Sequence, residues 1–231
     1  MNKETLVVMG NGPSLADVDF NLLSKFDTFG LNSAYKAYYK LGWWPTYHGS
    51  FDYLITRENK QQFKKLIKDA KSIKKFFYLE SISDDSRCQL IKLLPFGSSN
   101  KWNTTQEDFL SFNDGGNSGV NACQVGVCLG YKKIILVGVD CNYPELDNFE
   151  KLHDGKFRLN KKIESNQWHW FEDYLEVGDV INPPNVKKFH LEPWIRFASK
   201  AFENGVEVIN CSLQSKLNCF KKSTIEKQLD I

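Results

Sequence analysis

Long hydrophobic runs and an excess of charge of one sign are both missing from this chain of 231 residues. No apolar stretch approaches the roughly 20 residues that a membrane-spanning helix needs, and no charged segment followed by a long apolar one opens the chain, so we expect no secretory leader. Lys and Arg number 30 against 28 Asp and Glu, a net charge of +2, which disfavours a dedicated nucleic-acid-binding protein. We expect a soluble, cytoplasmic protein; peripheral contact with the inner membrane and homo-oligomer formation stay open.

Cysteines at metal-binding spacing are also absent. The six cysteines occur without C-x-x-C or C-x-x-H spacing, so the sequence predicts neither a zinc site nor a redox motif. They are Cys88, Cys123, Cys128, Cys141, Cys211 and Cys219. Hydrophobic residues make up 42% of the chain and aromatic residues 14%, which is typical of a globular protein with a sizeable core.

Apolar runs alternate with helix-like segments along the chain, a pattern typical of an α/β fold with a mostly parallel sheet flanked by helices. The expected strands are Thr5–Met9, Thr28–Leu31, Thr46–Ser50, Lys75–Leu79, Lys133–Val139 and Glu207–Asn210. The expected helices are Leu15–Ser24, Ser33–Leu41, Lys60–Lys71, Asp84–Leu94, Ser118–Leu129 and Glu192–Asn204. We predict one Rossmann-like domain over residues 1–231. Within it, the irregular polar and aromatic segment 142–188 is predicted to be a lid or a binding insertion.

The turn after the first strand carries the most specific pattern. The apolar run that ends at Met9 leads into Gly10-Asn11-Gly12-Pro13-Ser14, which is typical of a strand, a tight turn and a helix start. We predict that the two glycines adopt positive φ values and approach a ligand closely, and that Ser14 caps the following helix. Phosphates bind at such a turn in α/β sheets, although an ordinary strand-to-helix turn explains the pattern equally well.

A second glycine-rich loop, Asp114-Gly115-Gly116-Asn117-Ser118-Gly119, precedes a helix with small or apolar residues on nearly every side. The loop would present N–H donors and the Ser118 hydroxyl to an anion, and the helix should be buried and end at Gly130. Polar residues follow other expected strands: Asn32, Asp52, Asp140, Asn142 and Tyr143. Each alone is typical of a turn or cap, but together they predict a nucleotide site at one sheet edge.

These pieces together resemble the bacterial sialyltransferases of glycosyltransferase family 42 and shorter proteins that share their nucleotide-binding half. The resemblance rests on Gly10–Leu15, Asn32, Ser118–Val120, Leu129–Lys132 and Val137–Asp140, and loosely on His190 and Asn210–Ser212. It implies a Rossmann-like domain of the A-type glycosyltransferase variety that needs no metal or other cofactor. Its implied activity is the inverting transfer of sialic acid or a related keto-sugar from a CMP-sugar donor to a saccharide acceptor, in lipooligosaccharide or capsule synthesis.

The resemblance also implies roles for individual residues. The nucleotide-sugar would be held by Gly10, Asn11, Gly12, Ser14, Asn32, Asp52, Asn117, Ser118, Gly119, Asn142 and Tyr143. His190, just before the last long helix, is placed like the family's catalytic base, and a neutral imidazole can take a proton from an acceptor hydroxyl. His169 is the alternative base. The aromatic residues around it, Trp168, Trp170, Phe171 and Tyr174, would form either a platform for a sugar ring or a small core beneath the loop.

The sequence departs from that family, and two alternatives stay open. Asp52 stands where those enzymes place an asparagine, and Asn142 stands where they carry a tyrosine. A transferase similar to the archaeal-type pterin pyrophosphokinases would use ATP and magnesium, with Asp52 and Asp140 as metal-binding carboxylates at neighbouring strand ends. A nucleotide- or carbohydrate-binding module would instead bind its ligand without turnover.

Overall fold

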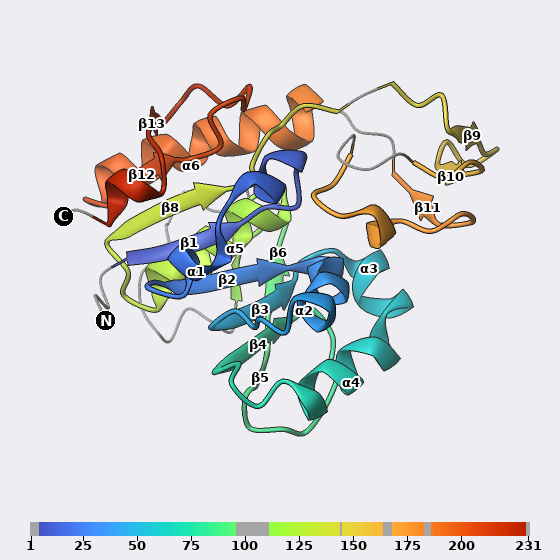
Figure 1. Cartoon of the computed structure of the whole chain (residues 1–231), viewed down its shortest axis with the longest axis horizontal. Helices are drawn as coiled ribbons and strands as arrows, with labels where there is room; N and C mark the ends of the chain where they lie inside the picture. The colour runs from blue at the N-terminus through green and yellow to red at the C-terminus, as the bar shows by residue number, and fades with distance from the viewer. Residues whose placement is uncertain (1–4, 96–110, 144, 164–167, 183–185, 230–231) are drawn as a thin grey trace.

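A parallel sheet of eight strands forms the centre of the computed structural model, which describes residues 5–95, 111–143, 145–163, 168–182 and 186–229 (Figure 1). The strand order is β13-β12-β8-β1-β2-β3-β4-β5, and each neighbouring pair is parallel. The strands are β1 (Thr5–Met9), β2 (Asp27–Leu31), β3 (Tyr47–Ser50), β4 (Lys75–Tyr78), β5 (Cys88–Leu90), β8 (Lys133–Val137), β12 (Glu207–Asn210) and β13 (Lys221–Lys222). The predicted α/β class with a mostly parallel sheet is confirmed.

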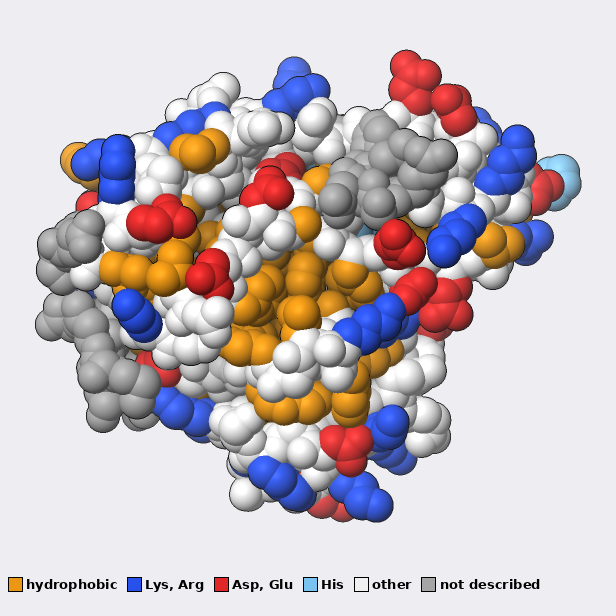
Figure 2. Space-filling model, viewed as in Figure 1, with side chains coloured by type: hydrophobic (Ala, Val, Ile, Leu, Met, Phe, Trp, Pro, Cys, Tyr) orange, Lys and Arg blue, Asp and Glu red, His pale blue; other side chains and the backbone are white. Residues whose placement is uncertain are grey.

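Helices cover both faces of this sheet. They are α1 (Phe20–Leu23), α2 (Tyr35–Leu41), α3 (Tyr53–Glu58), α4 (Lys60–Asp69), α5 (Ser118–Cys128) and α6 (Glu192–Glu203). Alternate residues of β1 point to opposite faces: Leu6 and Val8 pack in the core that includes α5 and α6, whereas Val7 and Met9 pack beside α1. Figure 2 shows hydrophobic side chains gathered in the middle of one face. Phe20 and Trp43, which pack against the core beside α1, are only partly buried.

Two of the predicted helices are wrong. Over Asp84–Leu94 the chain forms β5 and then β6 (Lys92–Leu94), which pairs in parallel with β7 (Ser111–Asn113). The guanidinium of Arg87 donates to the carbonyl oxygens of Ile67, Ala70 and Ile73 and so fixes this segment beside β4 in an extended conformation. These hydrogen bonds link Arg87 to residues 14 to 20 positions earlier in the chain. Local periodicity in the sequence cannot reveal contacts over that separation.

The helix predicted over Leu15–Ser24 is replaced by two short pieces, the 3-10 helix η1 (Pro13–Asp17) and α1. Asp19, whose carboxylate accepts the N–H of Asn21, caps α1. The extended backbone of Val18 separates the two pieces, so one helix cannot run through them. The prediction for α5 is confirmed, because this helix is buried along its length and Gly130 follows it with a φ of +96°.

The segment 142–188 contains a small antiparallel sheet of β9 (Phe149–Lys151), β10 (Phe157–Leu159) and β11 (Val180–Ile181), to the right in Figure 1. Trp168 packs in the core of this sheet, whereas Trp170 packs in the core beside β1 and stacks on Phe20 at a centroid distance of 5.3 Å. Of the two alternatives for these aromatic residues, packing in a core is the one that describes both tryptophans. The lid role and the single-domain organisation stay predictions. Within the described ranges, no helix combines the length and the apolar character that a bilayer crossing requires.

A fully buried histidine, His48, lies within β3. Neither ring nitrogen has a hydrogen-bond partner among the described residues, and burial lowers the pKa of His48 from 6.5 to about 3. The rings around it are those of Tyr35, Tyr38, Phe63 and Tyr78. The folded chain therefore keeps His48 neutral at pH values where the unfolded chain protonates it.

This difference makes the stability depend on pH. Since the unfolded state binds the extra proton, the free energy of unfolding should fall as the pH decreases from about 6.5 toward about 3. Between about pH 7.5 and pH 5.5, we expect His48 to account for about 1 kcal/mol of the loss, and His48→Phe should remove that share. Urea unfolding at the two pH values measures it. The exposed His153 provides the control His153→Phe, which should keep the full loss; an unchanged loss in His48→Phe would contradict the assignment.

Candidate functional site

The turn after β1 is held against the loop after β8. Because β1 and β8 pair in register from Thr5 with Lys133 to Met9 with Val137, Gly10 and Gly138 lie side by side. The N–H groups of Gly10 and Gly12 donate to the carbonyl oxygens of Val137 and Gly138, each at 2.8 Å. The prediction of positive φ is wrong, since neither Gly10 nor Gly12 has one and the turn continues the extended backbone of β1.

Positions 10 and 12 require glycine because atoms of the loop after β8 lie too close for a side chain. A Cβ atom on Gly10 would lie 2.3 Å from the carbonyl oxygen of Gly138, and one on Gly12 would lie 2.2 Å from Oδ2 of Asp140. The same Oδ2 accepts the main-chain N–H of Ser14 at 2.9 Å. Ser14 does not cap η1 with its hydroxyl, which has no partner in the described structure, so that prediction is wrong; the carboxylate from the β8 loop binds the helix start instead.

Asn32, which follows β2, lies next to Ser118, the first residue of α5. The amide nitrogen Nδ2 of Asn32 lies 3.4 Å from Oγ of Ser118, and Asn32 has a φ of +52°, a left-handed conformation that asparagine tolerates better than most residues. Asn117 caps α5 by accepting the N–H of Val120 at 2.9 Å. In the part of the chain that the structure describes, the N–H groups of Ser118 and Gly119 have no acceptor, and such a helix start is a typical anion site.

The two preceding glycines do not present donors to a ligand. The N–H of Gly115 donates to Oδ1 of Asn121 at 2.7 Å, and the N–H of Gly116 donates to Oδ1 of Asp114 at 2.9 Å. The sequence interpretation of this loop as a row of free N–H groups is therefore wrong for both residues. Asn121, buried inside α5, supplies the competing acceptor.

Both candidate bases lie among the predicted site residues, in different surroundings. His190 is in the short π-helix η5 (Val186–Leu191), and its Nδ1 lies 3.4 Å from the hydroxyl of Tyr143. The neighbouring Phe189 accepts from Nδ2 of Asn117 at 3.2 Å, which ties this segment to the start of α5. Burial lowers the pKa of His190 to about 4, so its imidazole is neutral at pH 7.

His169 is covered by an aromatic ring. Its ring stacks on Tyr174 with a centroid distance of 3.8 Å and an angle of 10°, and burial lowers the pKa of His169 to about 3. The hydroxyl of Tyr174 accepts from Nδ2 of Asn11 at 3.1 Å. Tyr174 in the 3-10 helix η4 (Glu172–Tyr174) thus connects the segment 142–188 to the N-terminal turn. The sequence named Tyr174 only as an aromatic residue, because no local pattern reveals a contact across 163 positions.

Asp52 and Asn142 are placed differently from the predicted group. Oδ1 of Asp52 accepts the N–H groups of Leu54 and Ile55 at 2.8 and 3.2 Å, so it caps α3. In the sheet order, β3 lies three strands from β8, or about 14 Å at the usual strand spacing. Asp52 and Asp140 therefore do not follow neighbouring strands, and that expectation is wrong. Asn142 is exposed.

Buried polar atoms without partners gather at this sheet edge. Four of them belong to Asn11 (Oδ1), Ser14 (Oγ), Asn32 (Oδ1) and Asp140 (Oδ1). Buried polar atoms in native proteins are nearly always hydrogen-bonded, so such a group at one sheet edge indicates a ligand site. The sequence named Asn11, Ser14 and Asn32 as contacts of the nucleotide-sugar, and it named Asp140 as a strand-end residue and, in the pyrophosphokinase alternative, as a metal ligand.

Comparison with solved structures shows a shared fold. The sialyltransferase CstII from Campylobacter jejuni, in complex with the substrate analogue cytidine-5'-monophosphate, is 17% identical over 96% of this chain and 86% of that chain, with a TM-score of 0.52. The sialyltransferase CST-II with a trisaccharide acceptor and CMP is 18% identical over 94% and 85%, with a TM-score of 0.54. The Maf glycosyltransferase from Magnetospirillum magneticum gives 12% identity and a TM-score of 0.54, over 99% of this chain and 36% of that one. No curated protein sequence matches.

These structures confirm that the chain shares the fold of the sialyltransferases. A comparison with protein-family models identifies the family to which the chain belongs. A family model described as "6-hydroxymethylpterin diphosphokinase MptE-like" matches residues 1–146. This match includes β1 to β8, with the N-terminal turn, Asn32, Ser118 and Asp140, and it covers more than half of the chain. The chain belongs to the MptE-like family.

Proposed function

We propose that the chain is an inverting glycosyltransferase that moves sialic acid or a related keto-sugar from a CMP donor to a saccharide acceptor in surface glycan synthesis. One observation carries the proposal: the N-terminal turn and the Asn32–Ser118 pair lie at the carboxyl edge of the parallel sheet, and the segment that carries His190 is bound to the start of α5 through Asn117 and Phe189. The fold shared with CstII extends over 94% to 96% of the chain and thus beyond the family match at residue 146.

The start of α5 suits the phosphate of such a donor. The N–H groups of Ser118 and Gly119, together with the helix dipole, would stabilise the negative charge that CMP carries when it leaves. The unpartnered Oδ1 atoms of Asn11 and Asn32 would accept hydrogen bonds from the amino and hydroxyl groups of a nucleoside. Binding would thus use protein donors and acceptors alone, and no metal takes part in the proposed reaction.

His190 would act as the general base. Its imidazole is neutral because burial lowers its pKa to about 4, and the Tyr143 hydroxyl near Nδ1 would orient the ring so that Nε2 can take a proton from the acceptor. The acceptor oxygen would form a bond to the anomeric carbon as the bond to the CMP phosphate oxygen breaks. Attack from the face opposite to CMP would invert the anomeric centre.

A second candidate function follows from the family description. An MptE-like diphosphokinase would transfer a diphosphate from ATP to a hydroxymethylpterin, and residues 1–146 match that family. The carboxylate pair that motivated this alternative is separated in the sheet, and Asp52 is engaged as the cap of α3. We therefore place this candidate second, ahead of a binding module without catalysis.

Nucleotide titration distinguishes the two functions. CMP at about a hundred times its Kd should stabilise the protein by about 2.7 kcal/mol, which raises Tm by roughly 5 to 10 °C for a chain of this size. The increase in Tm should be the same with magnesium and with a chelator. In a turnover assay with saccharide acceptors, the protein should then release CMP from CMP-sialic acid. Magnesium-dependent stabilisation by ATP without a response to CMP would overturn the proposal in favour of the diphosphokinase.

A matched pair of serine variants locates the binding site. Ser118→Ala removes a hydroxyl at the start of α5 and should weaken CMP binding by about tenfold to a hundredfold, the usual loss of a hydrogen bond to a charged group. Ser199→Ala removes an exposed hydroxyl on α6 and should change nothing. Isothermal titration with CMP measures both. Equal affinities in the two variants would contradict the phosphate position.

A further inference from the structure

A pocket of about 560 Å³ opens at the ends of β8 and β12, and it shares Ser14 and Asp140 with the candidate site. It is lined by η1, the loop after β8, the loop after β12 and the C-terminal segment at η6 (Glu226–Gln228). Ser14 and Asn142 border it, but Asn32, Ser118 and His190 do not. Its size suits a small polar molecule, since ligand pockets commonly measure about 300 to 1,000 Å³.

Carboxylates dominate the charge of this pocket. Among the described residues, its lining includes Asp17, Asp140 and Glu226 and contains no lysine or arginine. Asp17 and Glu226 are exposed, and neither forms an ion pair within the described chain. The ammonium of Lys222 lies at the edge of the lining, where it donates to the carbonyl oxygens of Leu213 and Ser215, so this one cation stands against three carboxylates. Such a lining attracts a cation and disfavours phosphate.

Asp140 supplies an independent sign of a ligand. Asp140 belongs to the pocket lining, it is only 8% exposed, and its Oδ1 has no hydrogen-bond partner in the described structure. The Ser14 hydroxyl beside it also lacks a partner. A carboxylate taken out of water without a nearby cation is costly, and its field acts strongly over a short distance in a low-dielectric interior. A positively charged group bound in the pocket would offset this cost.

We propose that this pocket binds a saccharide-sized molecule with a free ammonium group. The ammonium would lie toward Asp140, with Asp17 and Glu226 adding attraction at the rim. Polar side chains of Gln214 and Thr224 would bind hydroxyl groups. Because Leu213 and Ile225 supply apolar surface, an amino sugar fits this lining better than a simple amine. The proposal requires neither CMP nor turnover, so it stands apart from the proposed function.

Glucosamine is the probe, and N-acetylglucosamine is its neutral counterpart. Below neutral pH, where its amine is protonated, glucosamine should bind at least about tenfold more tightly than N-acetylglucosamine. Added salt should weaken the binding of glucosamine, because it screens the attraction between the ammonium and the carboxylates. The double variant Asp17→Asn with Glu226→Gln should weaken glucosamine binding severalfold, while Asp154→Asn, an exposed carboxylate at the β9–β10 turn, should not. Protein-observed NMR measures all of these affinities.

Three results would overturn the proposal: equal affinity for the two sugars, no saturable glucosamine binding up to its solubility limit, or binding that the rim substitutions leave unchanged. Asp140→Asn is a second variant, and it should cause the largest loss of glucosamine affinity. Circular dichroism and the Tm of this variant show whether it folds. Because the rim variant should keep the full CMP response of the native chain, failure of this pocket and failure of the nucleotide site can be told apart.

Discussion

Replacing His190 with alanine should lower turnover with a CMP-sugar by a factor of about a hundred or more, while the affinity for CMP changes less than about threefold. The expected loss is that of a general base, because the imidazole is neutral at pH 7 and lies beside the Tyr143 hydroxyl. CMP affinity should hold because the proposed nucleotide contacts come from other residues, at the start of α5 and in the N-terminal turn. Rates of CMP release and CMP titrations measure the two quantities.

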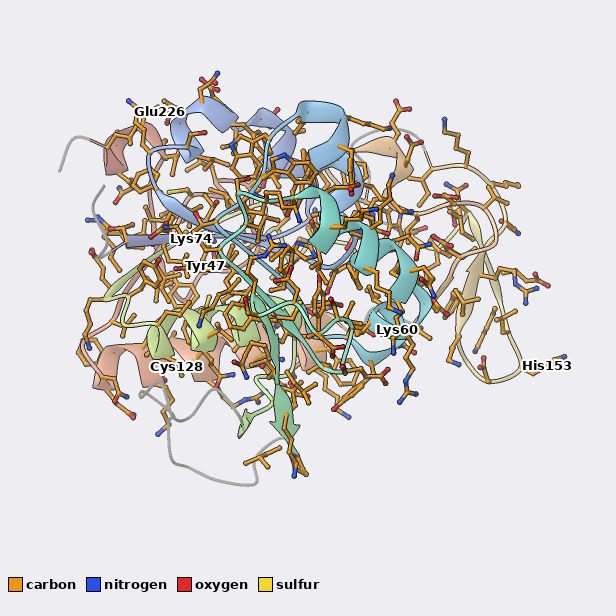
Figure 3. The ribbon with its side chains drawn as sticks, turned by 90° about the horizontal axis from the view of Figure 1, so that it is seen from below. Tyr47, Lys60, Lys74, Cys128, His153 and Glu226 are labelled. Atoms are coloured by element: carbon orange, nitrogen blue, oxygen red, sulfur yellow. The ribbon has the colours of Figure 1, made fainter. Side chains whose placement is uncertain are left out.

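The pH profile provides a readout that a structural role would not change. Since burial lowers the pKa of His190 to about 4, the rate should stay flat from neutral pH to about pH 5 and fall as the pH approaches 4, whereas an exposed imidazole would already lose activity near pH 6.5. His153, which lies at the tip of the β9–β10 turn and points away from the body of the molecule in Figure 3, gives the matched control His153→Ala. Full activity in His190→Ala together with a large loss in His169→Ala would transfer the role of base to His169.

The second large effect is expected from Gly10→Ala. A Cβ atom there would lie 2.3 Å from the carbonyl oxygen of Gly138, which is main chain and cannot rotate away. The hydrogen bonds from Gly10 to Val137 and from Gly12 to Gly138 would have to lengthen. We expect a loss of about 3 kcal/mol or more in the free energy of unfolding, together with loss of CMP binding, because the turn and the start of η1 would move.

Gly155→Ala provides the control. Gly155 has a φ of +81° in the β9–β10 turn, and a Cβ atom there would meet nothing within 4 Å, so only backbone strain of about 1 kcal/mol is expected. Urea unfolding compares the two variants, and CMP titration of Gly155→Ala should match the native protein. A Gly10→Ala variant as stable as Gly155→Ala would contradict the close packing of the two loops.

The strands and the long helices follow from local patterns in the sequence. The run Ile134–Val137 is apolar at every position, as a strand covered on both faces requires, and Gly130 ends α5 in the left-handed conformation that glycine adopts without strain. The residues expected to follow β1, β2 and β8 also lie at one edge, because parallel strands bring their carboxyl ends together. Periodicity failed over Asp84–Leu94, where the contacts of Arg87 override it.

The sequence by itself determined the α/β class, the order of most elements and the presence of Asn11, Ser14, Asn32 and Ser118 at one sheet edge. Local propensity and turn chemistry act over a few residues, and all of these features depend on them. Only the tertiary structure decided that the N-terminal glycines pack closely against Gly138 and Asp140 of the loop after β8, and that Asp52 caps a helix that follows a strand three positions from β8 in the sheet. It also placed Tyr174 against Asn11, across 163 residues, because such contacts arise only when distant segments pack together.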